Sequence, residues 1–308
     1  MEKLQRKIVK IRSKTFYSFV LLAIIYASVN LLAAPPRTTL QKYHISSSSL
    51  HLLNATIVVP VIAIWFVALY GYQRLRTYAG YIKDNKDGRQ VVKLTRGLML
   101  LAFWLPVSST LSAVLNMYGV HHPGATPMIT IIINYLTLLF PLGAFIWISQ
   151  GARGLSELSK QRPTPTGTNL MAIVLIVAGV FYGYLVANAH QHVHTIYHMP
   201  MLVVLLTLVI PYIYSWFLGI LAAYEIHMYS KKVNGIIYRK SWNALAIGLV
   251  WIIVFSIVFQ YFTTVSAKLN NLSLGWILVI IYTLLPLMAI GYIFVALGAK
   301  RLTKIEEV

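Results

Sequence analysis

The 308-residue chain contains no cysteine. It therefore has no disulfide framework, no thiolate metal ligand and no thiol nucleophile. The sequence motifs of hydrolytic and nucleotide chemistry are missing as well, because there is no HExxH zinc motif, no GxSxG nucleophile turn and no Walker loop. The sequence predicts a protein that is not an enzyme and that requires no cofactor.

Charge is also scarce. Charged residues make up 11% of the chain and hydrophobic residues 58%, and the mean hydropathy is +0.71. A soluble protein averages about 25% charged residues because water must wet its surface. This chain has too little charge to cover a water-facing globule, so we expect most of its surface to face lipid.

The sequence contains several long apolar runs. A helix across a hydrocarbon core of about 30 Å needs roughly 20 apolar residues. Eight runs qualify, near residues 15–34, 52–73, 97–118, 127–150, 169–189, 201–226, 242–266 and 274–298. The first is not read as a cleaved signal peptide, because its apolar run exceeds an h-region of about 7–15 residues and Pro35 would follow the cut directly.

The few charges are mostly basic, with 26 Lys and Arg against 7 Asp and Glu and a net charge of +19. In a soluble protein this excess would suggest nucleic acid. Here only Arg37, Lys42 and Lys268 fall on one side of the predicted helices, and the other 23 fall on the opposite side. This asymmetry predicts that both termini are cytoplasmic, in a bacterial-type plasma membrane, with anionic lipid headgroups as partners.

The N-terminal residues 1–14 concentrate part of this basic charge. Leu4, Ile8 and Ile11 would share one helical face, with the basic residues beside it. Either an interfacial amphipathic helix or a solvated basic tail fits this pattern.

Short matches recur at a nearly constant distance along the chain. The stretch T-L-S-A-V-L-N at 110–116 returns as T-V-S-A-K-L-N at 264–270, with five of seven letters identical. The other matches are Pro-x4-Trp-Phe at 60–66 and 211–217, and Gly-Ala-Arg at 151–153 with Gly-Ala-Lys at 298–300. The offsets of 154, 151 and 147 positions differ only by loop-sized insertions, although convergence among membrane helices would also produce matches.

We interpret these matches as a duplication. The predicted fold class is an all-α polytopic integral membrane protein with eight transmembrane helices in two parallel four-helix repeats, residues 15–158 and 159–308. Because each repeat has an even number of helices, both halves would have the same orientation, related by an axis along the membrane normal. A shared site would then lie between the halves.

Ionisable side chains are nearly absent from the predicted spans, which argues against a proton-coupled transporter or an ion pump. Uncharged polar groups do occur there, and some of them repeat. The predicted inter-repeat polar site consists of Thr110, Ser112, Asn116, Tyr135, Thr264, Ser266, Asn270 and Tyr282. The alternative is ordinary interhelical hydrogen bonding, worth about 0.6 kcal/mol per bond.

Histidine is unusual in its distribution, because eight of the nine fall on the outer side. His190, His194 and His198 are spaced four apart and would share one face of a helix. Imidazoles in this arrangement could hold Zn²⁺ or Cu²⁺, or sense pH. A structural zinc site needs four ligands, however, and loop histidines also serve as simple polar residues.

Three functions follow from these patterns. The first is a non-catalytic membrane scaffold whose basic face holds anionic lipid or a protein partner. The second is a facilitated carrier for a small neutral or apolar solute between the repeats. The third is a histidine-dependent metal or pH sensor on the outer face.

Overall fold

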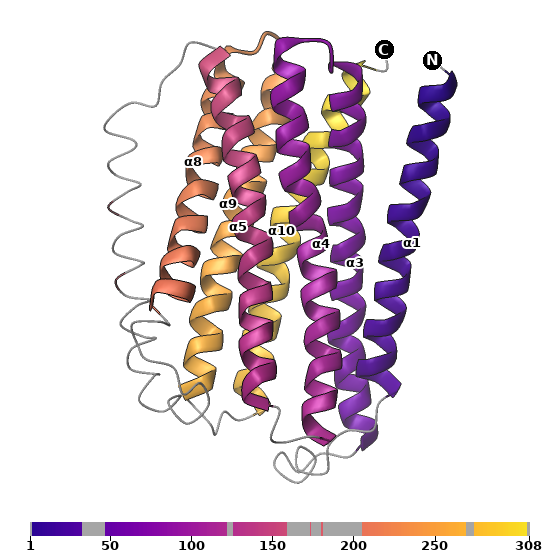
Figure 1. Ribbon diagram of the computed structural model, residues 1–308, viewed down its shortest axis with the longest axis vertical. Coiled ribbons are helices and arrows are strands. Elements are labelled where there is room, and N and C mark those ends of the chain that lie inside the picture. Colours follow the sequence, from indigo (N-terminus) through magenta and orange to yellow (C-terminus); the bar gives the residue numbers. More distant parts are fainter. Residues whose placement is uncertain are drawn as a thin grey trace.

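A computed structural model describes residues 2–32, 47–121, 126–158, 205–268 and 274–306, together with Ile173 and Val180, and it is all-helical (Figure 1). The described residues form seven α-helices and one π-helical turn. These elements are α1 (Glu2–Leu32), α3 (Ser47–Tyr81), α4 (Lys86–His121), α5 (Thr126–Leu158), η2 (Leu205–Val209), α8 (Ile210–Lys232), α9 (Ile236–Lys268) and α10 (Leu274–Glu306).

Five helical stretches within the described residues are long and apolar enough to cross a membrane. They are Lys14–Leu31, Asn54–Tyr81, Lys86–Leu115, Ile236–Phe259 and Tyr282–Ile305. The protein is therefore a helical membrane protein by length and composition. Helix α5 covers the fourth predicted span, and η2 with α8 covers residues 205–226 of the sixth. The fifth, 169–189, lies outside the described residues except for Ile173 and Val180, so the count of eight stays a prediction.

The helices extend beyond the spans predicted from the sequence. The region 74–96, expected as a loop, is mostly helical, because α3 continues to Tyr81 and α4 begins at Lys86. Hydropathy detects the lipid-facing part of a helix only. Arg, Gln, Leu and Ala are good helix formers in water, so the helix continues past the hydrocarbon until the short turn at 82–85.

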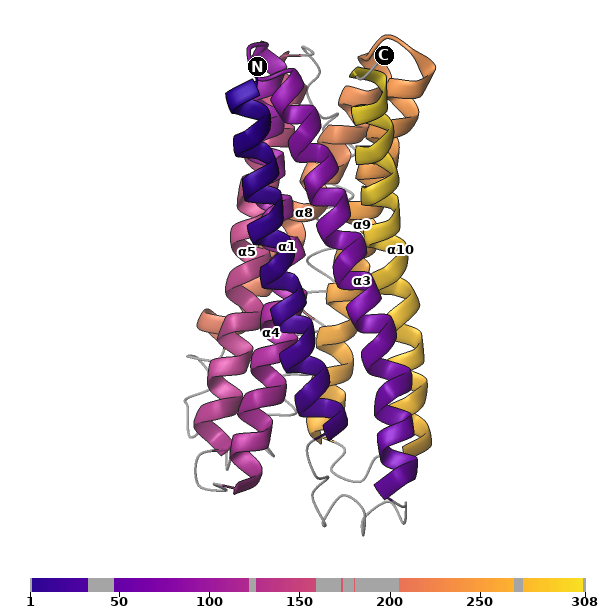
Figure 2. The same cartoon turned by 90° about the vertical axis from the view of Figure 1, so that its right-hand side faces the viewer.

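Six of the helices form a closed ring. Going round, α3 packs against α4, α4 against α5, α5 against α8, α8 against α9, α9 against α10, and α10 against α3. Helix α1 lies outside this six-helix ring, against α3 and α4 (Figures 1 and 2). The contacts of α5 with α8 and of α10 with α3 join the first half of the chain to the second, so the two halves interlock.

The turns that join α3 to α4 and α8 to α9 lie at the same end of the ring as both chain termini (Figure 1). Apart from Lys14 of α1, the exposed cations of the described residues gather there. They are Lys83, Lys86, Arg89, Arg96, Arg153, Lys231, Lys232, Arg239, Lys240, Lys300, Arg301 and Lys304. We call this the basic end.

Glycines set the two closest helix pairs. Packing in lipid lacks a hydrophobic drive between helices and depends on small residues that let backbones approach. A methyl group added to Gly151 of α5 would lie 2.7 Å from the Gln90 carbonyl oxygen of α4. One added to Gly298 of α10 would lie 2.7 Å from the Ser241 carbonyl oxygen of α9.

A second pair of glycines makes matching contacts one to two helical turns farther from the basic end. A methyl group on Gly97 of α4 would meet the backbone at Ala144 and Ile148 of α5, and one on Gly248 of α9 would meet it at Gly291 and Val295 of α10. Contacting residues on α4 and α9 are 151 positions apart, and those on α5 and α10 are 147 apart. The pairs α4–α5 and α9–α10 are therefore held by matching contacts.

Candidate functional site

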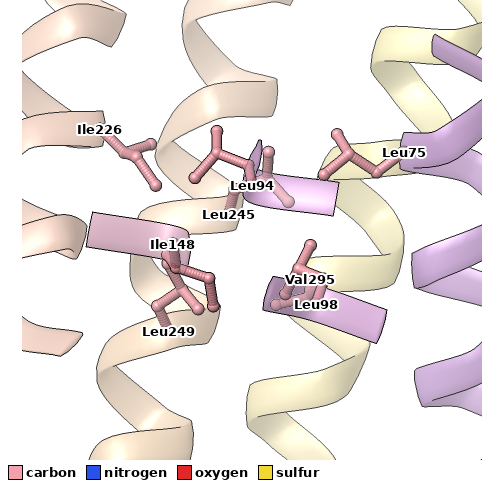
Figure 3. A pocket seen from close by; sticks show the side chains of 8 residues that line it. All are labelled: Leu75, Leu94, Leu98, Ile148, Ile226, Leu245, Leu249 and Val295. Atoms are coloured by element: carbon pink, nitrogen blue, oxygen red, sulfur yellow. The ribbon is translucent and has the colours of Figure 1, made fainter. Parts of the chain in front are cut away.

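The centre of the six-helix ring holds a small apolar cavity, the axial cavity, of about 10 Å³ (Figure 3). It is lined by Leu75, Leu94, Leu98, Ile148, Ile226, Leu245, Leu249 and Val295. This volume is close to the minimum for one water molecule, and a water needs two or more polar partners. The lining offers no polar side chain, so the cavity should be dry.

The lining residues come in four pairs with the spacings found for the glycine contacts. Leu75 and Ile226, Leu94 and Leu245, and Leu98 and Leu249 are each 151 positions apart, and Ile148 and Val295 are 147 apart. Each of the six ring helices contributes at least one of them. A cavity bordered by all six helices lies on the long axis of the ring, so anything that moved along this axis would have to cross this layer.

The axial cavity is nearer to the basic end than to the other end. Leu94 and Leu98 follow the start of α4 at Lys86 by 8 and 12 residues. With a rise of about 1.5 Å per residue, the layer lies roughly 12–18 Å from that end of the helix. The described layer contains no reactive or charged group, so its chemistry is limited to excluding water.

An aromatic layer follows on α4 and α9, farther from the basic end. The rings of Trp104 and Phe255, residues 151 positions apart, have centroids 6.3 Å apart. The Trp104 Nε1–H is buried and has no hydrogen-bond partner in the described part of the chain. Tyr292 of α10 donates its hydroxyl to the Leu101 carbonyl oxygen at 3.0 Å. This layer is the first along the axis that offers polar groups.

The matching halves differ at a second tryptophan pair. Trp65 and Trp216, 151 positions apart, are both fully buried. The Trp216 Nε1–H donates to the Ser256 hydroxyl at 3.1 Å. The residue 151 positions before Ser256 is Leu105, and the Trp65 Nε1–H has no partner among the described residues. The two halves therefore share the buried tryptophan but not its hydrogen bond.

Two of the sequence-predicted polar residues join the halves. Tyr135 of α5 donates its hydroxyl to Thr207 Oγ1 at 2.6 Å, and the hydroxyls of Tyr282 in α10 and Thr56 in α3 lie 3.0 Å apart. The threonines are 151 positions apart and the tyrosines 147. These are again matching contacts, and both cross between the halves. Sequence reasoning missed the threonines, although their spacing of 151 positions could have identified them as a pair.

Two other members of the predicted polar site, Thr110 and Ser112, have described side chains on α4. Thr110 is buried and donates to the Leu22 carbonyl oxygen of α1 at a long 3.4 Å, and Ser112 is half-buried. The side chains of Asn116, Thr264 and Ser266 lie outside the described residues, as does Asn270 as a whole. The structure therefore describes four of the eight side chains, and the inter-repeat polar site stays a prediction.

The predicted metal ligands His190, His194 and His198 lie outside the described residues. Within the described ranges, no three His, Asp or Glu side chains form a group that could hold a metal ion.

Polar side chains of α8 cluster near the basic end. Tyr229 donates its hydroxyl to Asp87 Oδ2 of α4 at 2.9 Å. Burial, followed by the Asp87 carboxylate, raises the pKa of Tyr229, so the phenol stays protonated and remains a donor. His227 Nδ1 lies 2.9 Å from Asn243 Oδ1 of α9. Glu225 is buried, and its Oε2 has no partner within the described chain.

No protein-family model, curated protein or solved structure matches this chain.

Proposed function

We propose that this chain is a non-catalytic multi-pass membrane protein whose closed helical bundle carries a basic end that binds anionic lipid headgroups. The observation that supports this most directly is the gathering of exposed cations at one end of the ring, the end at which the α3–α4 and α8–α9 turns and both chain termini lie (Figure 1). Lys and Arg beside an anionic leaflet contribute about 1 kcal/mol each to the attraction. Orientation of this end toward the cytoplasm is part of the proposal.

The densest group of these cations surrounds the turn between α8 and α9. Lys231, Lys232, Arg239 and Lys240 are all exposed there, and Arg239 Nη2 donates to the Lys231 carbonyl oxygen at 3.4 Å. We call these four residues the α8–α9 basic patch. Because the turn holds them within a few residues of the helix ends, all four can face the headgroup layer together.

The α8–α9 basic patch gives a direct test. In neutral detergent, added phosphatidylglycerol should raise the melting temperature more than phosphatidylcholine does, because a ligand that binds only the folded state stabilises it. The variant K231Q/K232Q/R239Q/K240Q should lose most of this difference. The matched control K231R/K232R/R239K/K240R keeps the charge and should retain it. Equal shifts with both lipids in the native protein would refute headgroup binding.

A second candidate is a facilitated carrier for a small neutral or apolar solute, with residues 15–158 and 159–308 as duplicated halves. Its support is the axial cavity, whose eight lining residues form four pairs at repeat spacing and come from all six ring helices. The matched Tyr–Thr hydrogen bonds between the halves also support it. Parallel repeats related by an axis along the membrane normal commonly place the transport site between the halves.

Reconstituted vesicles test the carrier. Protein-dependent flux of at least one neutral solute from a panel of water, glycerol, urea and small sugars is expected, and N116A/N270A should lower it by removing two repeated amides. Vesicles made with heat-denatured protein provide the background. If native vesicles pass every solute at the background rate, the chain is not a carrier for this panel and the scaffold proposal stands alone.

A further inference from the structure

The axial cavity lies where side chains of all six ring helices meet, and its lining is wholly apolar. Water among apolar side chains lacks hydrogen-bond partners, so an apolar layer of this kind excludes water and blocks polar solutes. The side chains come from opposite sides of the ring and converge on one point (Figure 3). They therefore close the axis in a single layer.

The next buried polar groups lie on the side of this layer that is farther from the basic end. The unpartnered Trp104 Nε1–H and the Tyr292 hydroxyl lie next. The buried Trp104 indole donor therefore lies on the far side of the apolar layer from the basic end. The closure thus separates the polar part of the axis from the basic end.

We infer that Leu94, Leu98, Leu245 and Leu249, with the other four lining residues, form a hydrophobic gate across the ring axis that is closed in this structure. The gate rests on the carrier function proposed above. Its permeants are small neutral molecules, since a charged solute would lose its hydration in the apolar layer with nothing to replace it. Small relative movements of the interlocked halves would open it, because paired residues from both halves form it.

Shortening the side chains that line the axial cavity should open the gate. The variant L98A/L249A removes one equivalent pair from the lining, and osmotic water permeability of reconstituted vesicles, followed by stopped-flow light scattering, should rise several-fold over native protein. The matched control is L155A/L302A. These two leucines are fully buried, are 147 positions apart, and do not line the cavity. The control should leave water permeability at the native level.

A milder variant, L98V/L249V, covers the case in which the alanine pair does not fold, and its permeability should rise in the same direction. Helical circular dichroism and the melting temperature establish that each variant is folded. If the folded cavity variants stay as impermeable as native protein, or if L155A/L302A leaks equally, the gate is wrong.

The gate and the carrier can fail separately. Solute flux through native protein with no leak in L98A/L249A would keep the carrier and remove the gate. A leak in L98A/L249A without any native solute flux would keep a closed axial constriction and remove the carrier.

Discussion

Cysteines introduced at Asn85 and Asn234 will react from the same side of the membrane, and a cysteine at Met117 will react from the opposite side. Asn85 lies in the turn between α3 and α4, and Asn234 in the turn between α8 and α9, and both side chains are exposed. Both turns lie at the basic end (Figure 1), whereas Met117 is 40% exposed near the far end of α4. A polar reagent cannot cross the hydrocarbon core, so the difference is all-or-none.

The absence of native cysteine makes the experiment clean, because each variant carries a single reactive thiol. A membrane-impermeant maleimide should label M117C in intact cells and label N85C and N234C only after permeabilisation, as the positive-inside rule requires. The cysteine-free parent measures non-specific labelling. Opposite accessibility of N85C and N234C would overturn both the orientation and the parallel arrangement of the halves.

Hydropathy was sufficient to predict an all-helical membrane protein, because a hydrocarbon core demands long apolar helices whatever the fold. It could not place helix ends, and the expected loop at 74–96 is mostly helix. Residues 74–81 are polar enough to leave the lipid and still favour the helix. Backbone hydrogen bonding, which decides where the helix stops, leaves no trace in a hydropathy window.

The candidate site was only partly predictable for a similar reason. Tyr135 and Tyr282 were predicted from their polarity and their spacing of 147 positions, and each hydroxyl lies within hydrogen-bond distance of a threonine from the other half of the chain. The leucines of the axial cavity were missed. In a helix that is apolar all round, nothing in the sequence distinguishes a side chain facing the axis from one facing lipid. That distinction arises only when six helices close into a ring.

Replacing Gly151 or Gly298 by alanine will destabilise the protein, although alanine is the better helix former by about 1 kcal/mol. At both positions the new methyl group would lie 2.7 Å from a carbonyl oxygen of the neighbouring helix. A backbone atom cannot rotate away, so the helices must separate. Overpacking of this kind typically costs about 1–3 kcal/mol. Because the two sites are in different helix pairs, the double variant should lose about the sum of the two.

Gly80 provides the matched control, since it is an exposed helical glycine of α3 with nothing within 4 Å of an added methyl group. At this position only the higher helix propensity of alanine acts, so G80A should be neutral or slightly stabilising. The free energy of unfolding can be followed by circular dichroism as denaturing detergent is titrated into mixed micelles. Equal losses in G151A and G298A are expected if α4–α5 and α9–α10 are equivalent pairs. A loss in one with none in the other would contradict that equivalence.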